Sequence, residues 1–78
     1  MKVDIVIPQM GANITEGKIV RWFKKPGDKV QDLDPLYELE TSKASFEIEA
    51  ETAGTLLEIV HESGTFPPLT VVGYIEAD

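Results

Sequence analysis

Glycine and proline recur along the whole chain, and this recurrence constrains the fold more than any other feature of the sequence. The 78 residues include six Gly and five Pro, and β-branched or aromatic residues are frequent between them. Proline removes a helical hydrogen bond and glycine is unfavourable inside a helix, so no long helix fits between these positions. The sequence therefore predicts an all-β domain of short strands connected by turns.

The expected strands fall into two similar halves of the chain. Alternating apolar and polar residues predict strands at 3–7, 17–24, 36–41, 44–50, 54–61 and 71–76, with turns at 26–28 and 62–64. A shift of 36 or 37 residues superimposes Gly17 on Gly54, Ile19 on Leu56, Trp22 on Ile59, Gly27 on Gly64, Leu36 on Val72 and Leu39 on Ile75. Two such units predict a compact β-sandwich or flattened barrel with pseudo-twofold symmetry. The repeated three-residue spacing, as from Ile19 to Trp22, breaks strict alternation and predicts a β-bulge or a strand that bends from one sheet to the other.

Residues 36–50 form the most informative stretch, which predicts a hairpin with Lys43 at its tip. With Ser42 and Lys43 as central turn residues, residues 37–41 lie opposite residues 48–44. The apolar side chains then share the core face (Tyr37, Leu39, Phe46, Ile48), and the acidic ones share the solvent face (Glu38, Glu40, Glu47, Glu49). A slip of one residue would bury the glutamates, so the pattern fixes the register. We expect a type I turn, because Ser-Lys lacks the Gly or Asn of primed turns.

Charge and composition exclude several classes of function. The formal charge of −7 and a pI near 4.5 oppose binding to nucleic acid or to an anionic membrane. The chain has no cysteine, and His61 is its only histidine, so we expect no metal site and a surface position for His61. A chain of 78 residues has no room for a deep active-site cleft, so we expect no catalytic residues. We interpret the alternating glutamates of the hairpin as solvated and Trp22 and Phe46 as core residues.

Lys43 is the residue to which the pattern draws most attention. It is the only Lys or Arg after Lys29, and a turn tip would hold its amine clear of the body of the domain. From the pattern alone, two interpretations stay open: a solvated turn lysine and a lysine exposed for covalent modification.

The residues around Lys43 resemble those of a known family. Glu40-Thr41-Ser42-Lys43-Ala44 resembles the lipoylation motif of lipoyl domains, usually Glu-Thr-Asp-Lys-Ala. Further landmarks match at the family's spacings: residues 7–11, Glu16-Gly17, Trp22, residues 26–30, Ala53-Gly54 and Val72-Gly73. The resemblance implies one lipoyl domain over residues 1–78, folded as a barrel-sandwich hybrid of two four-stranded antiparallel sheets.

The resemblance also implies a function. Lys43 would receive lipoic acid in amide linkage from a lipoate ligase or a lipoyl/octanoyl transferase. The resulting swinging arm would visit a thiamin-diphosphate-dependent decarboxylase, an acyltransferase core and a dihydrolipoamide dehydrogenase in a 2-oxo acid dehydrogenase complex. The loop from Met10 to Glu16 would lie beside Lys43, and the implied recognition residues are Glu40, Thr41, Ser42, Ala44, Gly11, Asn13 and Glu16. Ser42 replaces the usual Asp, which leaves the partner open and admits an acetoin or branched-chain 2-oxo acid complex; we expect its hydroxyl to bond nearby backbone groups.

Three alternatives to a lipoyl domain stay open. A biotin carrier shares this architecture, but its lysine is normally flanked by methionines, whereas the glycine-cleavage carrier resembles a longer chain. An unmodified β-barrel interaction module is the alternative from another class.

We expect a monomer, either excised from a larger acyltransferase or free-standing, with no signal peptide or membrane span. Its location would be the cytoplasm of a bacterium or archaeon, or the mitochondrial matrix of a eukaryote.

Overall fold

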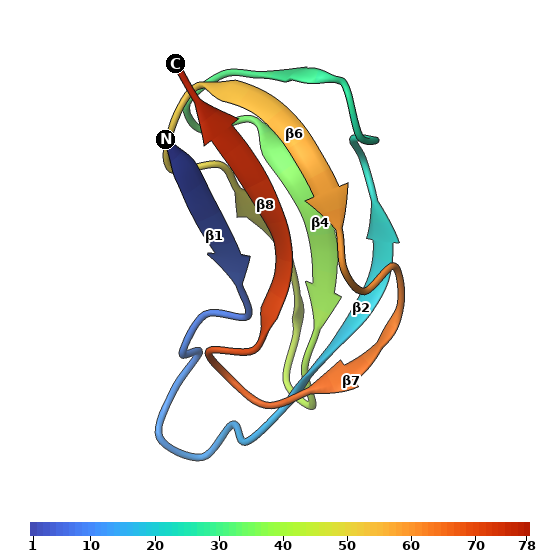
Figure 1. Ribbon diagram of the computed structural model, residues 1–78. Helices are drawn as coiled ribbons and strands as arrows, with labels where there is room; N and C mark the ends of the chain where they lie inside the picture. The colour runs from blue at the N-terminus through green and yellow to red at the C-terminus, as the bar shows by residue number, and fades with distance from the viewer.

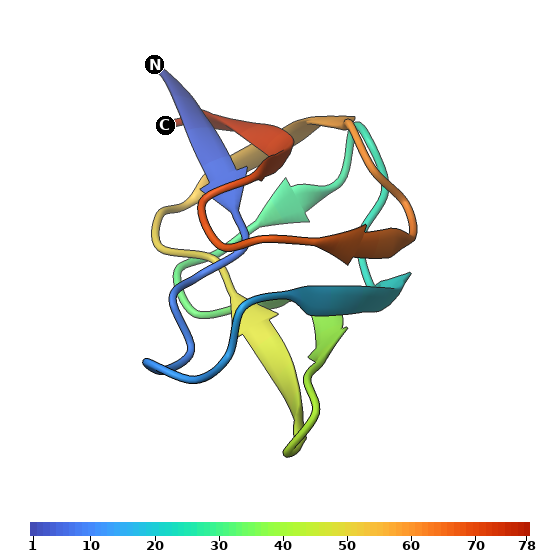
Figure 2. The ribbon, with the colours of Figure 1, turned by 90° about the horizontal axis from the view of Figure 1, so that it is seen from below.

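Eight short strands make up the regular structure, which a computed structural model describes for residues 1–78. One sheet has the strand order β1-β8-β6-β3 and the other has the order β5-β4-β2-β7, with every pairing antiparallel (Figures 1 and 2). The fold class expected from the sequence is confirmed. The strands are β1 Lys2–Val6, β2 Gly17–Trp22, β3 Lys29–Val30, β4 Pro35–Glu40, β5 Ser45–Glu49, β6 Gly54–Ile59, β7 Gly64–Phe66 and β8 Val71–Ala77.

The two sheets repeat one arrangement, as the internal repeat predicted. Each strand of one sheet has a counterpart at the same place in the other sheet: β1 corresponds to β5, β8 to β4, β6 to β2 and β3 to β7. The register of β2 on β4 shifts between Ile19 and Arg21, and that of β6 on β8 shifts between Leu56 and Glu58. These two irregularities lie 37 residues apart, so the predicted bulge is confirmed and occurs once in each half.

Two strands were not predicted from the alternating pattern. β3 has two residues and β7 has three, too few to show a period of two. Each pairs with the start of a longer strand of its own sheet, β3 with β6 and β7 with β2. The chain forms no helix long and apolar enough to cross a membrane.

The core lies between the sheets and consists of side chains from both. Trp22 packs against it half-buried, with its ring centroid 4.9 Å from that of Tyr37 and its indole N–H donating to the His61 carbonyl at 2.9 Å. The prediction that Phe46 belongs to the core is wrong, because its side chain is 41% exposed. Phe46 lies on the edge strand β5, in a hairpin that extends beyond the other sheet (Figure 2). The buried apolar residues are Ile5, Ile7, Ile19, Val30, Leu36, Tyr37, Leu39, Ala50, Leu56, Val72 and Ile75.

Candidate functional site

The hairpin of β4 and β5 has the register that the sequence predicted. Tyr37 pairs with Ile48, Glu38 with Glu47, Leu39 with Phe46, and Glu40 with Ser45. Tyr37 and Leu39 are fully buried, which fixes the β4 side of the hairpin on the core. The hairpin therefore continues the sheet, and its tip protrudes from the body of the domain (Figure 2).

The buried Tyr37 holds the base of this hairpin against the other sheet. Its hydroxyl donates to the Val6 carbonyl oxygen at 3.0 Å, which joins β4 to the end of β1. Burial raises the pKa of Tyr37 well above the ordinary value near 10, because desolvation disfavours the phenolate. The neutral phenol is consequently the form that stabilises the junction.

Hydrogen bonds of Thr41 close the turn at the tip. The Thr41 backbone N–H donates to the Ala44 carbonyl at 2.8 Å, and the Thr41 hydroxyl donates to the same oxygen at 3.0 Å. The hydroxyl oxygen also accepts from the backbone N–H groups of Lys43 and Ala44, each at 3.3 Å. Neither Ser42 nor Lys43 has a positive φ, which excludes the primed turns and agrees with the predicted type I turn.

This role of Thr41 corrects the expectation for Ser42. The hydroxyl of Ser42 makes no hydrogen bond, whereas that of Thr41 makes three. The preference of Ser and Thr for turns is similar, so the sequence did not distinguish between the two residues. The geometry does, because only the side chain at the first turn position points back over the N–H groups of the turn.

Lys43 lies in the turn between β4 and β5 and is exposed to solvent, as are its neighbours Ser42 and Ala44. Its ammonium group forms no ion pair; the three ion pairs of the molecule involve the N-terminus, Arg21 and Lys24. A long side chain at this position is free to leave the surface in any outward direction. The tip can therefore present a primary amine to another protein.

The loop before β2 lies beside the hairpin, as the resemblance implied. A polar groove of about 350 Å³ is bounded by the loop on one side and the hairpin on the other. It brings Asn13 and Glu16 together with Glu40, Thr41 and Ser42, whereas Gly11, Lys43 and Ala44 do not line it. Lys18 of β2 and Thr65 of β7 also line the groove, and neither was predicted, because they come from strands whose proximity the local sequence does not reveal.

The arrangement contains one chemically useful amine. No group of three or more His, Cys, Asp or Glu side chains is placed to hold a metal ion. Glu40, Glu47 and Glu49 are exposed along the hairpin, so they do not form a buried acid pair of the kind used in general acid–base chemistry. His61 stacks on Phe66 with ring centroids 4.3 Å apart and is partly buried, so its predicted surface position is only partly correct.

Comparison with known proteins finds relatives whose functions are described. The profile of the family described as "Biotin-requiring enzyme" matches residues 3–66. The chain is 43% identical over 61 residues to the dihydrolipoyllysine-residue succinyltransferase component of the 2-oxoglutarate dehydrogenase complex of Bacillus subtilis (strain 168). It is 38% identical over 65 residues to the dihydrolipoyllysine-residue acetyltransferase component of the pyruvate dehydrogenase complex of Rickettsia bellii (strain RML369-C). These matches cover 78% and 83% of this chain but only 15% and 16% of the relatives.

A solved structure resembles nearly the whole domain. It is the solution structure of the lipoyl domain of the 2-oxoglutarate dehydrogenase complex from Azotobacter vinelandii, with a TM-score of 0.76 and 32% identity. The match covers 97% of this chain and 99% of that one. The profile match, the identity to two acyltransferase components and this structural agreement together show that the chain belongs to the biotin/lipoyl family and is a lipoyl domain, a non-catalytic carrier module.

Proposed function

We propose that Lys43 carries lipoic acid in amide linkage and that the domain moves acyl groups and electrons between the active sites of a 2-oxo acid dehydrogenase complex. The observation that carries the proposal is the position of Lys43, which is exposed and unpaired in the turn of the β4–β5 hairpin. This position fits the cofactor, because an attached arm meets no protein wall that would restrict it. The dithiolane ring of the bound group would supply the site for acyl transfer and for reversible reduction.

The modification itself needs a partner enzyme. The neutral Lys43 amine would attack the carbonyl carbon of an activated lipoate, the bond from that carbon to the activating group would break and that group would leave, and loss of a proton from nitrogen would give the neutral amide. The hairpin offers no histidine or buried carboxylate near Lys43 to take that proton, since Glu40, Glu47 and Glu49 are exposed and the half-buried Glu38 pairs with Arg21 away from the turn. A lipoate ligase or a lipoyl/octanoyl transferase would therefore supply the base as well as the activated acyl group.

The carrier role rests on tethering. A domain that holds its reactive group on an arm replaces a bimolecular encounter by a high effective concentration at each active site. Its partners would be a thiamin-diphosphate-dependent decarboxylase, the acyltransferase core and dihydrolipoamide dehydrogenase. The polar groove between the loop and the hairpin, with Asn13, Glu16 and Glu40, would be the surface that the decarboxylase recognises. Gly11 would contribute through the shape of the loop and Ala44 through its place beside Lys43.

The setting of the domain follows from the same comparison. We propose that it acts as a monomer, because a net charge of −7 makes self-association unfavourable. Both relatives described above come from bacteria, which supports a cytoplasmic location; in a eukaryote the corresponding place would be the mitochondrial matrix. The two relatives belong to complexes for different 2-oxo acids, so the proposal extends to the class of complex and not to one substrate.

The test is enzymatic lipoylation followed by intact and peptide mass spectrometry. The domain is incubated with lipoate, ATP and a lipoate ligase, and in parallel with biotin, ATP and a biotin ligase. We expect one lipoyl adduct on Lys43 and none in Lys43→Ala, whereas Lys29→Ala, an exposed lysine on β3, keeps full modification. A biotin adduct on Lys43 would favour the biotin carrier, and a folded but unmodified domain would favour the unmodified interaction module.

A further inference from the structure

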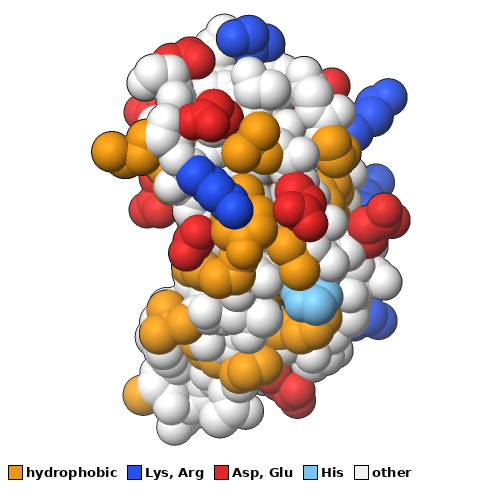
Figure 3. All heavy atoms as spheres, viewed as in Figure 1, with side chains coloured by type: hydrophobic (Ala, Val, Ile, Leu, Met, Phe, Trp, Pro, Cys, Tyr) orange, Lys and Arg blue, Asp and Glu red, His pale blue; other side chains and the backbone are white.

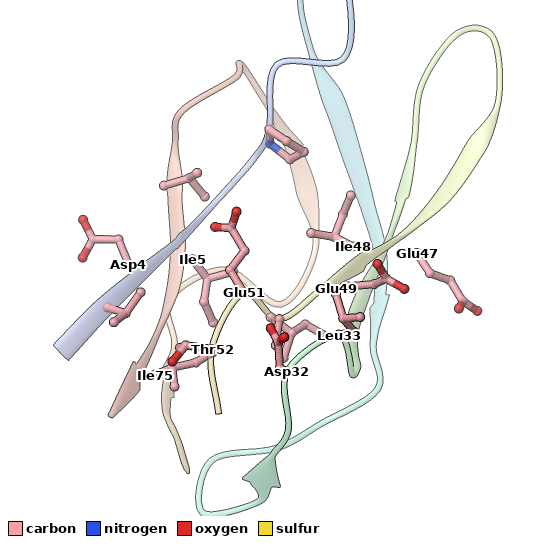
Figure 4. Close-up of a pocket in the computed structure, with 15 residues that line it drawn as sticks. Asp4, Ile5, Asp32, Leu33, Glu47, Ile48, Glu49, Glu51, Thr52 and Ile75 are labelled. Carbon is pink, nitrogen blue, oxygen red and sulfur yellow. The ribbon is translucent and has the colours of Figure 1, made fainter. Parts of the chain in front are cut away.

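A groove opens between β1, an edge strand of one sheet, and β5, an edge strand of the other. β1 pairs only with β8 and β5 pairs only with β4, so each strand keeps one backbone edge without a strand partner. The groove has a volume of about 620 Å³. Figure 4 shows Ile5 of β1 and Ile48 of β5 on its two sides.

The floor of the groove is apolar. Ile5, Leu36 and Ile75 line it as buried members of the core, and Ile48 adds a half-buried side chain. At one end the groove includes Leu33, whose side chain is 64% exposed. An apolar side chain that entered the groove would remove this surface from water, which is favourable by about 25 cal/mol per Å² buried.

The rim of the groove carries charge of one sign only. Five carboxylates line it, and no Lys, Arg or His does. All five are exposed and none takes part in an ion pair, so they are available to a cation from outside. By contrast, the face in Figure 3 has basic and acidic side chains interspersed around a central hydrophobic band. The five rim residues are Asp4, Asp32, Glu47, Glu49 and Glu51, shown in Figure 4.

We propose that this groove binds an extended segment of another polypeptide in which Lys or Arg alternates with branched apolar residues. In an extended chain, successive side chains point to opposite faces, so the apolar ones can face the floor while the basic ones reach the rim. The free backbone edge of β1 or β5 can pair with such a segment, a mode of recognition known as β-augmentation. The apolar floor, the acidic rim and the free strand edge thus favour one kind of occupant.

The same observations disfavour other occupants. A second copy of this domain would bring its own rim of carboxylates and a net charge of −7, so the two copies would repel each other. A phosphate-bearing ligand would be repelled for the same reason. The groove does not include Lys43 or any residue of the turn, so a segment bound there leaves the tip free. The domain could hold a partner in the groove and still present Lys43 to an enzyme.

The probe for this site is a capped synthetic peptide, Lys-Val-Lys-Ile-Lys-Val-Lys, titrated into the isotopically labelled domain and followed by backbone amide chemical shifts. We expect the largest shifts in β1 and β5, and binding that weakens as the salt concentration rises. Two control peptides separate the contributions: one with Glu in place of Lys, and one with Ser in place of every apolar residue. Each should bind about tenfold more weakly or worse, because each lacks one of the two complementary features.

Surface variants with matched controls locate the binding. Glu49→Lys with Glu51→Lys should weaken peptide binding about tenfold, whereas Glu58→Lys with Glu62→Lys, equal charge reversals outside the groove, should change it less than twofold. Leu33→Asn should weaken it about threefold. Its control is Leu69→Asn, because Leu69 is similarly exposed, has nearly the same positive φ and lies outside the groove.

The proposal is overturned if the peptide causes no shifts, if its shifts centre outside β1 and β5, or if the serine peptide binds as tightly as the apolar one. Equal losses of peptide affinity in the groove variants and in their controls would overturn it as well, because binding would then not depend on the groove. Circular dichroism of every variant confirms that it is folded before titration. None of these measurements depends on lipoylation, so they test the groove independently of the carrier function.

Discussion

The two halves of this domain differ most where equivalent strands end. β4 and β5 are joined by the four-residue turn from Thr41 to Ala44, which carries Lys43. Their counterparts β8 and β1 pair in the same antiparallel way but are not connected, and the N- and C-termini lie there, at the end opposite the hairpin (Figure 1). The strand framework is thus common to both halves, and the display of a lysine depends on the turn alone.

Packing inside the two halves also differs at equivalent positions. Trp22 pairs with Tyr37 in one sheet, and Ile59 pairs with Gly73 at the corresponding place in the other. A Cβ on Gly73 would lie 2.8 Å from the Glu58 carbonyl oxygen of its own half and 3.2 Å from Cη2 of Trp22, so the small residue also makes room for the large residue of the other half. The halves therefore share a backbone plan, while their side chains are complementary.

The largest difference in stability is expected between alanine variants of two glycines that start equivalent strands. A Cβ on Gly54 would lie 2.0 Å from the Glu76 carbonyl oxygen, whereas a Cβ on Gly17 would lie 2.8 Å from the side-chain carbon Cδ1 of Leu39. Backbone cannot move without breaking the ladder, but a leucine can change rotamer. Gly54→Ala should lower the free energy of unfolding by about 3 kcal/mol or more, and Gly17→Ala by about 1 kcal/mol.

Urea unfolding followed by tryptophan fluorescence measures both changes. Equal losses in the two variants would show that the β6–β8 contact adapts as easily as the core around Leu39. That result would contradict the asymmetry inferred from the contacts.

The second prediction concerns Tyr37, which has Gly73 as its counterpart. The pKa of Tyr37 is raised by burial in the folded state, so the folded chain binds the phenolic proton more tightly than the unfolded chain does. Stability from this group is complete below the unfolded pKa near 10 and is lost as pH rises toward the folded value. Above about pH 10 the loss approaches about 1.4 kcal/mol per pH unit.

Tyr37→Phe separates this effect from other alkaline changes. The variant loses the hydrogen bond to the Val6 carbonyl, which should cost about 1 kcal/mol at neutral pH. It should also show a flatter decline in stability above pH 10 than the wild type, measured by urea unfolding at each pH. Parallel pH profiles for the two proteins would rule out Tyr37 as the source of alkaline instability.

The third prediction compares the threonines of two turns. The Thr41 hydroxyl bonds within the turn of Lys43, and the Thr70 hydroxyl donates to the Pro67 carbonyl at 2.8 Å in a turn of the other half. Val keeps the shape of Thr and removes the hydroxyl, so Thr41→Val and Thr70→Val should each cost about 1 kcal/mol of stability.

Only the first of these variants should alter modification. Without these hydrogen bonds the turn would hold Lys43 in the productive geometry for a smaller fraction of the time. Thr41→Val should therefore lower kcat/KM for lipoylation about fivefold, which corresponds to about 1 kcal/mol. Thr41→Ser keeps the hydroxyl and should restore most of the rate. An unchanged rate in Thr41→Val, or an equal decrease in Thr70→Val, would remove Thr41 from the presentation of Lys43.

The sequence predicted those features that depend on a repeating pattern. The register of β4 on β5 followed from alternation, because any slip would bury glutamates, and the bulges followed from a broken period in each half. The strands β3 and β7 were missed because they are too short to have a period. Phe46 was misplaced because alternation shows which face a residue occupies but not where the opposite sheet ends. The position of the loop before β2 was expected only through the family resemblance.

Features formed by distant segments could not be read from the sequence. The groove between β1 and β5 joins strands some forty residues apart, and its rim is acidic only because three separate segments meet there, which contribute Asp4, Asp32 and residues 47–51. The polar groove beside Lys43 likewise combines Lys18 and Thr65 with the hairpin. In both cases the sequence showed the charges, but only the fold showed which of them are neighbours.

The smallest expected effects compare two leucines that adopt an unusual backbone conformation in equivalent turns. Leu33 has φ of 73° and Leu69 has φ of 72°, and the residues lie 36 positions apart in exposed turns. In the left-handed region a residue with a Cβ costs about 1–2 kcal/mol more than glycine. Glycine in turn loses about 0.5–1 kcal/mol through the greater freedom of the unfolded chain.

Leu33→Gly and Leu69→Gly should therefore each raise the free energy of unfolding by about 0.5–1 kcal/mol, and the double variant by about the sum, because no hydrogen bond joins the two turns. Thermal and urea unfolding of the three variants measures this. Two similar gains would mean that the strain belongs to the repeated backbone plan and is independent of the hairpin. A gain at Leu69 with a loss at Leu33 would break the equivalence, and it would assign to Leu33 a stabilising contact in the groove between β1 and β5 that outweighs the strain of its turn.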